Sequence, residues 1–122
     1  MQDGLEALRR ELAEFAAARD WEQFHTPKNL AMALAGEVGE LAAELQWLTD
    51  EEIQQRLATG VLRQRVAGEL ADVFIYLLQL ADVCGIELLP AAHAKVAENR
   101  VRYPVEKARG NARKYDELAD EE

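Results

Sequence analysis

The stretch that decides the fold class of this 122-residue chain is 61–84, VLRQRVAGELADVFIYLLQLADVC. Four of its polar side chains share an arc of roughly 80° on a helical wheel, and they are Glu69, Asp72, Tyr76 and Gln79. Apolar residues occupy most of the remaining circumference, whereas an ordinary surface helix has a broad polar face. The stretch is therefore predicted to be a helix that other helices or another subunit cover on several sides, with Gly85 as its left-handed terminator.

Two helices are predicted before this stretch. In the first, Asp3 and Glu6 resemble a capping box, and apolar residues recur at helical spacing at Leu5, Leu8, Leu12 and Phe15. The second begins with Thr26 as its N-cap and Pro27 as its first residue, and it runs to about Trp47.

Two more helices complete the predicted set. Thr49 and Glu52 open a short helix that Gly60 stops. The last helix starts at Pro90 and ends at the pair 103–104, Tyr-Pro, because a residue before proline avoids the α region.

These elements predict an all-α fold, a bundle of four or five helices, because no segment shows the alternation of a strand. The composition is that of a globular protein, with 49% hydrophobic and 30% charged residues. We expect a single domain over residues 1–115. Residues 116–122 hold five of the 23 acidic residues and are expected to form a flexible tail.

The charge and the cysteine content exclude several classes of function. A net charge of −9 argues against unaided binding to a nucleic-acid polymer, so an anionic ligand would need a cation between it and the protein. The single cysteine, Cys84, excludes an internal disulfide and a cysteine-rich zinc site. The longest apolar runs, 30–35 and 73–78, are too short for a membrane span. We expect a cytoplasmic protein without a membrane partner.

Two pairs of carboxylates lie on the most apolar predicted helices. Each pair has i, i+3 spacing, so its members project to one side, and the pairs are Glu37 with Glu40 and Glu69 with Asp72. Such pairs are common on solvated faces, which is the alternative interpretation. Four carboxylates inside a bundle would repel one another without cations, and oxygen ligands suit Mg²⁺ or Mn²⁺. The pattern predicts a metal site of that kind.

A redox di-iron bundle is the competing metal hypothesis. It would use Glu-x-x-His pairs within the bundle. Only Glu22 and His25 have this spacing, and they lie at a helix start. One such pair is too little, so the hypothesis is disfavoured.

The last predicted helix carries a cationic face. Lys95, Asn99 and Arg102 follow one another at i, i+4 and i+7, with Tyr103 beside them. This face could hold a phosphate chain, or it could be a solvated surface. Trp21 and Trp47 lie near helix ends, and two roles are open for them. Each could be a core plug, meaning a ring that fills the hydrophobic core, or a surface on which a nucleotide base stacks.

Four stretches together resemble the MazG-like all-α nucleotide pyrophosphohydrolases, and most of all their dCTP pyrophosphatase branch. The stretches are RDWEQFHTPKNL (19–30), GEVGELAAELQW (36–47), GELADVFIYLLQLAD (68–82) and KVAENRVRYPVEKARG (95–110). The family often has a doubled Glu at the start of each acidic motif, where this chain has Gly36 and Gly68.

The resemblance implies hydrolysis of a nucleoside triphosphate, such as dCTP, between its α and β phosphates in a homodimer or homotetramer. It implies that Mg²⁺ is held by Glu37, Glu40, Glu69 and Asp72. It implies phosphate or sugar contacts from Lys95, Asn99, Arg102 and Tyr103. It also implies a base and sugar pocket lined by Trp21, His25, Trp47 and Tyr76.

The mechanism expected from these assignments uses two catalytic residues. Glu37 is the candidate general base because it lies deepest in the apolar stripe of its helix. Lys95, with Arg102, would stabilise charge on the departing pyrophosphate. Two alternatives remain at this point. One is the same chemistry with a purine such as dGTP or with many nucleotides, and the other is a non-enzymatic helical binding or scaffold protein.

Overall fold

The computed structural model describes residues 3–119 and is all-α, with no strand among those residues. Its elements are α1 (Asp3–Ala18), the 3-10 helix η1 (Glu22–Phe24), α2 (Pro27–Leu45), α3 (Asp50–Ala58), α4 (Val61–Cys84), α5 (Leu88–Arg102), α6 (Val105–Ala108) and α7 (Tyr115–Ala119). The predicted fold class and the five predicted helices are confirmed. No single described helix has both the length and the apolar composition of a membrane span, although α4 and α5 pass that test as a bent pair.

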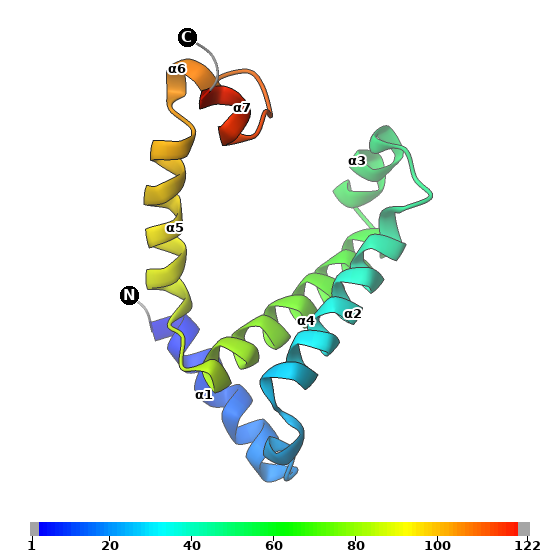
Figure 1. Cartoon of the computed structure of the whole chain (residues 1–122). Helices are drawn as coiled ribbons and strands as arrows, with labels where there is room; N and C mark the ends of the chain where they lie inside the picture. Colours follow the sequence, from blue (N-terminus) through cyan, green and yellow to red (C-terminus); the bar gives the residue numbers. More distant parts are fainter. Residues whose placement is uncertain (1–2, 120–122) are drawn as a thin grey trace. The chain divides into compact units, whose positions relative to one another are not determined.

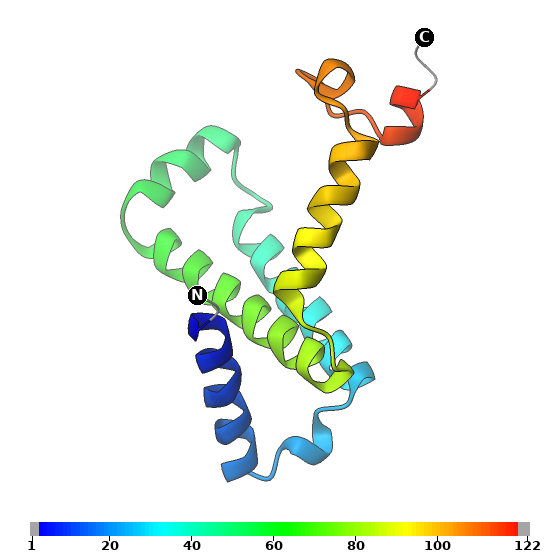
Figure 2. The same ribbon diagram turned by 90° about the vertical axis from the view of Figure 1, so that its left-hand side faces the viewer.

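The described residues fall into two compact units, the N-terminal unit up to residue 86 and the C-terminal unit from residue 87. In the N-terminal unit, α2 and α4 lie side by side along most of their lengths, and α1 and α3 pack against α4 (Figures 1 and 2). The single domain expected over residues 1–115 stays a prediction.

The buried core of the N-terminal unit comes from three helices. Ala16 of α1, Leu30 of α2 and the α4 residues Leu78 and Ala81 are each at most 6% exposed. Small and branched apolar side chains at these positions allow the three helices to pack closely. The pairing of α2 with α4 is thus anchored at the end where α1 joins them.

The predicted N-caps form at the starts of α2 and α3. The Thr26 hydroxyl accepts the backbone N–H of Asn29 at 3.2 Å, so Thr26 is the N-cap of α2. At α3 the capping box is complete, since the Thr49 hydroxyl accepts the Glu52 N–H at 3.1 Å and the Glu52 carboxylate accepts the Thr49 N–H at 3.0 Å. These two short motifs set the starts of α2 and α3.

Other boundaries differ from the predictions by about two residues. Helix α2 ends at Leu45, and α5 begins at Leu88, so Pro90 lies in its first turn, where a missing N–H costs no hydrogen bond. Helix α3 already ends at Ala58, and Gly60 is the N-cap of α4 with φ 93°. The side chain of Asp3 lies outside the described residues, so the capping box stays a prediction, and Glu6 pairs with Arg9.

The start of the predicted tail is helical. Residues 115–119 form α7, whose first turn carries Asp116 and Glu117, which suit the positive end of a helix. Leu118 is only 1% exposed, and burial of its apolar side chain stabilises this segment. Residues 120–122 lie outside the described part of the chain, and the flexibility expected for the tail stays a prediction.

The left-handed terminator of α4 gives a testable prediction about stability. Gly85 has φ 68° and ψ 30°, and a Cβ placed there would meet no atom within 4 Å. Gly85→Ala is therefore expected to destabilise the protein by about 1–2 kcal/mol through backbone strain alone. Urea unfolding followed by circular dichroism measures this change.

The matched control is the same substitution at Gly68, inside α4. Its Cβ would also meet no atom within 4 Å, but its backbone is helical. Gly68→Ala should therefore stabilise the protein by about 0.5–1 kcal/mol. Equal effects at the two positions would show that Gly85 is not a conformational terminator.

Candidate metal centre

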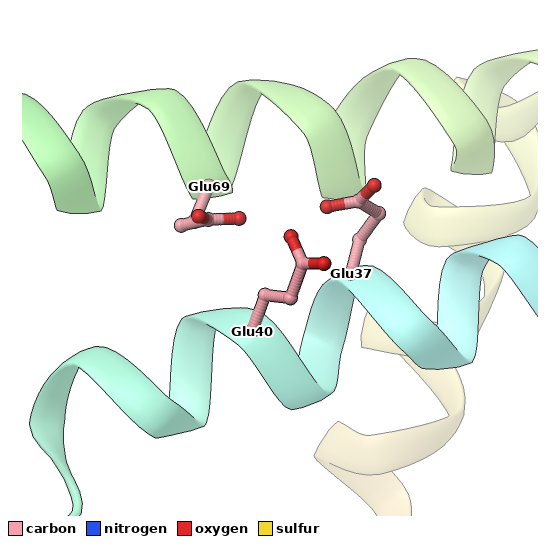
Figure 3. A group of neighbouring side chains, drawn as sticks. All are labelled: Glu37, Glu40 and Glu69. Carbon is pink, nitrogen blue, oxygen red and sulfur yellow. The ribbon is translucent and has the colours of Figure 1, made fainter.

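Three carboxylates meet between the paired helices α2 and α4. Glu37 and Glu40 are one turn apart on α2, and both side chains point toward α4, where the carboxylate of Glu40 lies between those of Glu37 and Glu69 (Figure 3). One oxygen from each residue lies within 4.8 Å of the oxygens of the other two. The spacing i, i+3 brings the first two to one helix face, and the packing of α2 on α4 adds the third. We call these three residues the carboxylate cluster.

Burial makes this cluster unusual. Glu37 and Glu69 are both half-buried, and the Oε2 atom of each is buried without a hydrogen-bond partner among the described residues. Burial of an unpaired carboxylate oxygen is costly unless a proton or a cation compensates it. The cluster therefore has two acceptor atoms that the described chain leaves unsatisfied.

The electrostatics of the cluster favour the uptake of positive charge. Burial raises the pKa of Glu37, and the neighbouring carboxylates of Glu40, Asp72 and Glu69 raise it further. Burial also raises the pKa of Glu69, again with help from the charges of Glu40 and Asp72. Both shifts show that negative charge is destabilised here, so a cation bound among these oxygens would relieve repulsion.

Two further acids surround the cluster. Asp72 is exposed, and it does not belong to the group of three, although its charge acts on Glu37 and Glu69. Glu44 is half-buried, and its charge raises the pKa of Glu69. The sequence analysis missed Glu44, although its position four residues after Glu40 places it on the same face of α2.

The donor set fits a hard divalent cation. All donors in the cluster are carboxylate oxygens, and its members include neither histidine nor cysteine. Ions such as Mg²⁺, Mn²⁺ and Ca²⁺ prefer oxygen ligands, whereas zinc and iron sites usually add imidazole or thiolate. The two partnerless oxygens are the observation on which this fit depends.

Hollows lie on both sides of the cluster along α4. One, of about 520 Å³, lies between α1, η1 and the second half of α4, and His25 lines it. The other, of about 640 Å³, lies where the end of α2, α3 and the start of α4 meet, and Trp47 lines it. His25 and Trp47 therefore line different hollows.

The remaining aromatic candidates line neither hollow. Trp21 is 44% exposed, with its ring edge-on to Phe15 at 5.7 Å between centroids, and Tyr76 is half-buried. Trp47 is 86% exposed. The alternative of a core plug therefore does not describe Trp47 in this structure, and its indole face is open to a ligand or a partner.

The cationic candidates belong to the C-terminal unit. The carboxylate of Glu98 forms ion pairs with both cations, at 3.1 Å from Lys95 Nζ and 2.5 Å from Arg102 Nη2. The Arg102 guanidinium also lies over the ring of Tyr115, 4.6 Å from its centroid. Tyr103 is half-buried and packs edge-on to the same ring, whereas Asn99 is exposed.

Comparison with known proteins identifies the relatives of the chain. A model of the MazG-like family matches residues 34–118, which include the whole carboxylate cluster. The dCTP pyrophosphatase 1 of Bos taurus is 51% identical over 114 residues, 93% of this chain and 68% of the bovine protein. That of Homo sapiens is 52% identical over 93% of this chain and 67% of its own length.

A solved structure agrees with these sequence relatives. The crystal structure of a pyrophosphatase from Archaeoglobus fulgidus matches with a TM-score of 0.77 at 39% identity. The match covers 83% of this chain and 93% of the archaeal one. The resemblance expected from the four motifs is confirmed, and the chain belongs to the MazG-like family.

Proposed function

We propose that this chain is a Mg²⁺-dependent nucleoside triphosphate pyrophosphohydrolase that cleaves between the α and β phosphates and releases a monophosphate and pyrophosphate. The carboxylate cluster, with two buried oxygens that lack partners, is the observation that carries the proposal. The relatives named dCTP pyrophosphatase 1 and the archaeal pyrophosphatase support an enzyme rather than a scaffold. Mn²⁺ has the same ligand preference and is expected to substitute.

A deoxynucleotide such as dCTP is the substrate that we propose. The names of the relatives support this choice. The residues proposed for contacts with the base and sugar are Trp21, His25, Trp47 and Tyr76, of which His25 and Trp47 line separate hollows of the same chain. Aromatic rings stack on every base, so a purine or broad preference is the alternative that a panel of nucleotides tests.

In the proposed site, acidic side chains bind the metal and basic side chains bind the phosphates. The ligands proposed for Mg²⁺ are Glu37, Glu40, Glu69 and Asp72. When bound, Mg²⁺ supplies neutralisation of the phosphate charge and polarisation of the phosphoryl oxygens. Lys95 and Arg102 stabilise the negative charge that develops on the departing pyrophosphate, and Asn99 and Tyr103 contact the phosphates or the sugar.

Glu37 is the proposed general base. A carboxylate of the cluster that Mg²⁺ does not fully use would accept the proton of the attacking water, and Glu37 lies deepest in the apolar stripe of α2. The half-buried position of Glu37 also limits competing hydrogen bonds from solvent. A proton taken from the attacking water would rest on this carboxylate until the product leaves.

We also propose that the protein works as a homodimer or homotetramer. Three large apolar residues of α4 follow one another at i, i+4 and i+7, and they are Leu70, Phe74 and Leu77, exposed by 52%, 37% and 40%. A continuous apolar stripe on one helix face usually marks an interface. A second copy of this chain is the partner proposed for it.

Removal of a proposed metal ligand is the first test of the function. Glu40→Gln or Asp72→Asn is expected to lower pyrophosphate release by about 100-fold or more, since a lost cation contact costs several kcal/mol in the transition state. The assay follows pyrophosphate and monophosphate formed from dCTP and from the other nucleotides. The helical circular dichroism spectrum should stay unchanged.

The control for charge is Glu51→Gln on α3, an exposed acid outside the cluster. It removes the same charge and should retain full activity. Normal turnover in both ligand variants would contradict the proposed site.

A rise in pH should lower the stability of the metal-free protein, whereas added Mg²⁺ should raise it. Between the ordinary pKa of glutamate and the raised pKa of Glu37, the folded state binds more protons than the unfolded state, so metal-free stability falls as the pH rises through the raised value. Mg²⁺ at about 100 times its Kd would add about 2.7 kcal/mol, most at high pH, where the carboxylates are ionised. Thermal melts with and without Mg²⁺ from pH 5 to pH 8 measure both effects.

Glu37→Gln should flatten the pH dependence and reduce the response to Mg²⁺. Below the ordinary pKa of glutamate the trend reverses, because the pKa of Glu6 and that of Glu52 are lowered by their hydrogen-bond donors. Their contributions are present above the unfolded pKa and are lost as the pH falls through the folded value. A metal-free melt that does not change between pH 5 and pH 8 would contradict a strained carboxylate cluster.

The oligomer is tested by light scattering after gel filtration. We expect two or four times the 13.7 kDa mass of the chain, and Leu77→Lys should shift the mass toward one chain, because it places a charge in the apolar stripe. Val105→Lys, at a 70% exposed position on α6, is the matched control. A monomeric wild-type protein would contradict the proposal.

A further inference from the structure

The side chain of Glu98 lies between two cations on one face of α5. Its Oε2 atom is 3.1 Å from Lys95 Nζ, and its Oε1 atom is 2.5 Å from Arg102 Nη2. The spacings i, i+3 and i+4 from Lys95 to Glu98 to Arg102 make the three residues neighbours on the helix surface. One carboxylate thus bridges both of the cations that we assign to the phosphate chain.

The surroundings make this acid exceptional. Residues 95–114 contain seven Lys and Arg residues but only two acids, Glu98 and Glu106. Hydrogen bonding from Lys95 and the charge of Arg102 lower the pKa of Glu98, so its carboxylate is ionised at neutral pH. The most basic segment of the chain therefore carries an anion at its two candidate phosphate-binding residues.

The guanidinium of Arg102 also contacts an aromatic ring. Its guanidinium lies 4.6 Å from the centroid of the Tyr115 ring, which packs edge-on to Tyr103 at 6.3 Å. A guanidinium that stacks on an aromatic ring keeps its N–H groups free for an anion at its edge. Arg102 would therefore keep its place when an incoming phosphate replaces the Glu98 carboxylate.

We propose that Glu98 is an internal counter-ion that occupies the phosphate position between Lys95 and Arg102 and competes there with the phosphate chain of substrate and product. The proposal rests on the phosphate role that the proposed function gives to these two cations. A carboxylate and a phosphate present similar pairs of oxygens to the same N–H donors. A triphosphate, with several charges, displaces this carboxylate more readily than a singly charged anion does.

The competition has a consequence for turnover. All three side chains are about 40–60% exposed, so the two ion pairs are weak enough to open. When pyrophosphate leaves, Glu98 can pair again with both cations, which lowers the affinity for this product. Glu98 would thus set the strength of phosphate binding without touching the reacting atoms.

The test uses Glu98→Gln in the full chain, with inorganic pyrophosphate and Mg²⁺ as the probe. The inhibition constant of pyrophosphate and its Kd from calorimetry should fall by about three- to tenfold at low salt. The KM for dCTP should fall in the same direction. The effect should shrink to less than about twofold at 0.5 M salt, because screening weakens exposed pairs.

Glu106→Gln is the matched control. It removes the same charge from the same unit, at an exposed α6 residue that pairs with none of the described cations. If Glu98→Gln changes pyrophosphate affinity no more than Glu106→Gln, or weakens it, the competition is overturned. A change in melting temperature alone would show only a helix-stabilising ion pair and would also overturn it.

Lys95→Ala separates this inference from the proposed function. Weaker pyrophosphate binding in Lys95→Ala, together with no effect of Glu98→Gln, would leave the phosphate role standing and overturn only the counter-ion. Unchanged binding in both Lys95→Ala and Arg102→Ala would instead overturn the phosphate role itself.

Discussion

Carboxylates that repel one another lie between α2 and α4, the most extensively packed helix pair of the N-terminal unit. The two helices pair closely, and their pairing brings Glu37, Glu40 and Glu69 together while two of the oxygens remain without hydrogen-bond partners. Such an arrangement lowers the stability of the metal-free chain, because burial and like charges both disfavour ionised carboxylates. A divalent cation bound at this helix pair would relieve the same repulsion.

The C-terminal unit has the opposite arrangement of charge in residues 95–114, where positive side chains predominate and an acid compensates them. There Glu98, one of two acids in a basic segment, pairs with Lys95 and Arg102. Protein charge alone would repel a nucleoside triphosphate from a chain with a net charge of −9. The acids of the N-terminal unit thus favour positive charge, and the cations of the C-terminal unit favour negative charge.

Much of the helical architecture could be predicted because short motifs determine it. Thr26 with Pro27 and the Thr49–Glu52 box satisfy N–H groups that a helix start leaves open, and Gly85 adopts a backbone conformation that other residues avoid. Each of these effects acts over a few residues. Where no such motif is present, as at the end of α2, the observed boundary differs from the predicted one by about two residues.

The all-α class, the starts of α2 and α3 and the carboxylate pairs at i, i+3 could be predicted, because they follow from local backbone chemistry and helical periodicity. The packing of the helices was needed to show which acids meet across α2 and α4, that Glu44 acts on Glu69 while Asp72 stays exposed, and that Leu118 is buried. The reason is physical: burial and distance between helices depend on packing of residues far apart in the chain, and the pattern of a single helix carries no information about its neighbour.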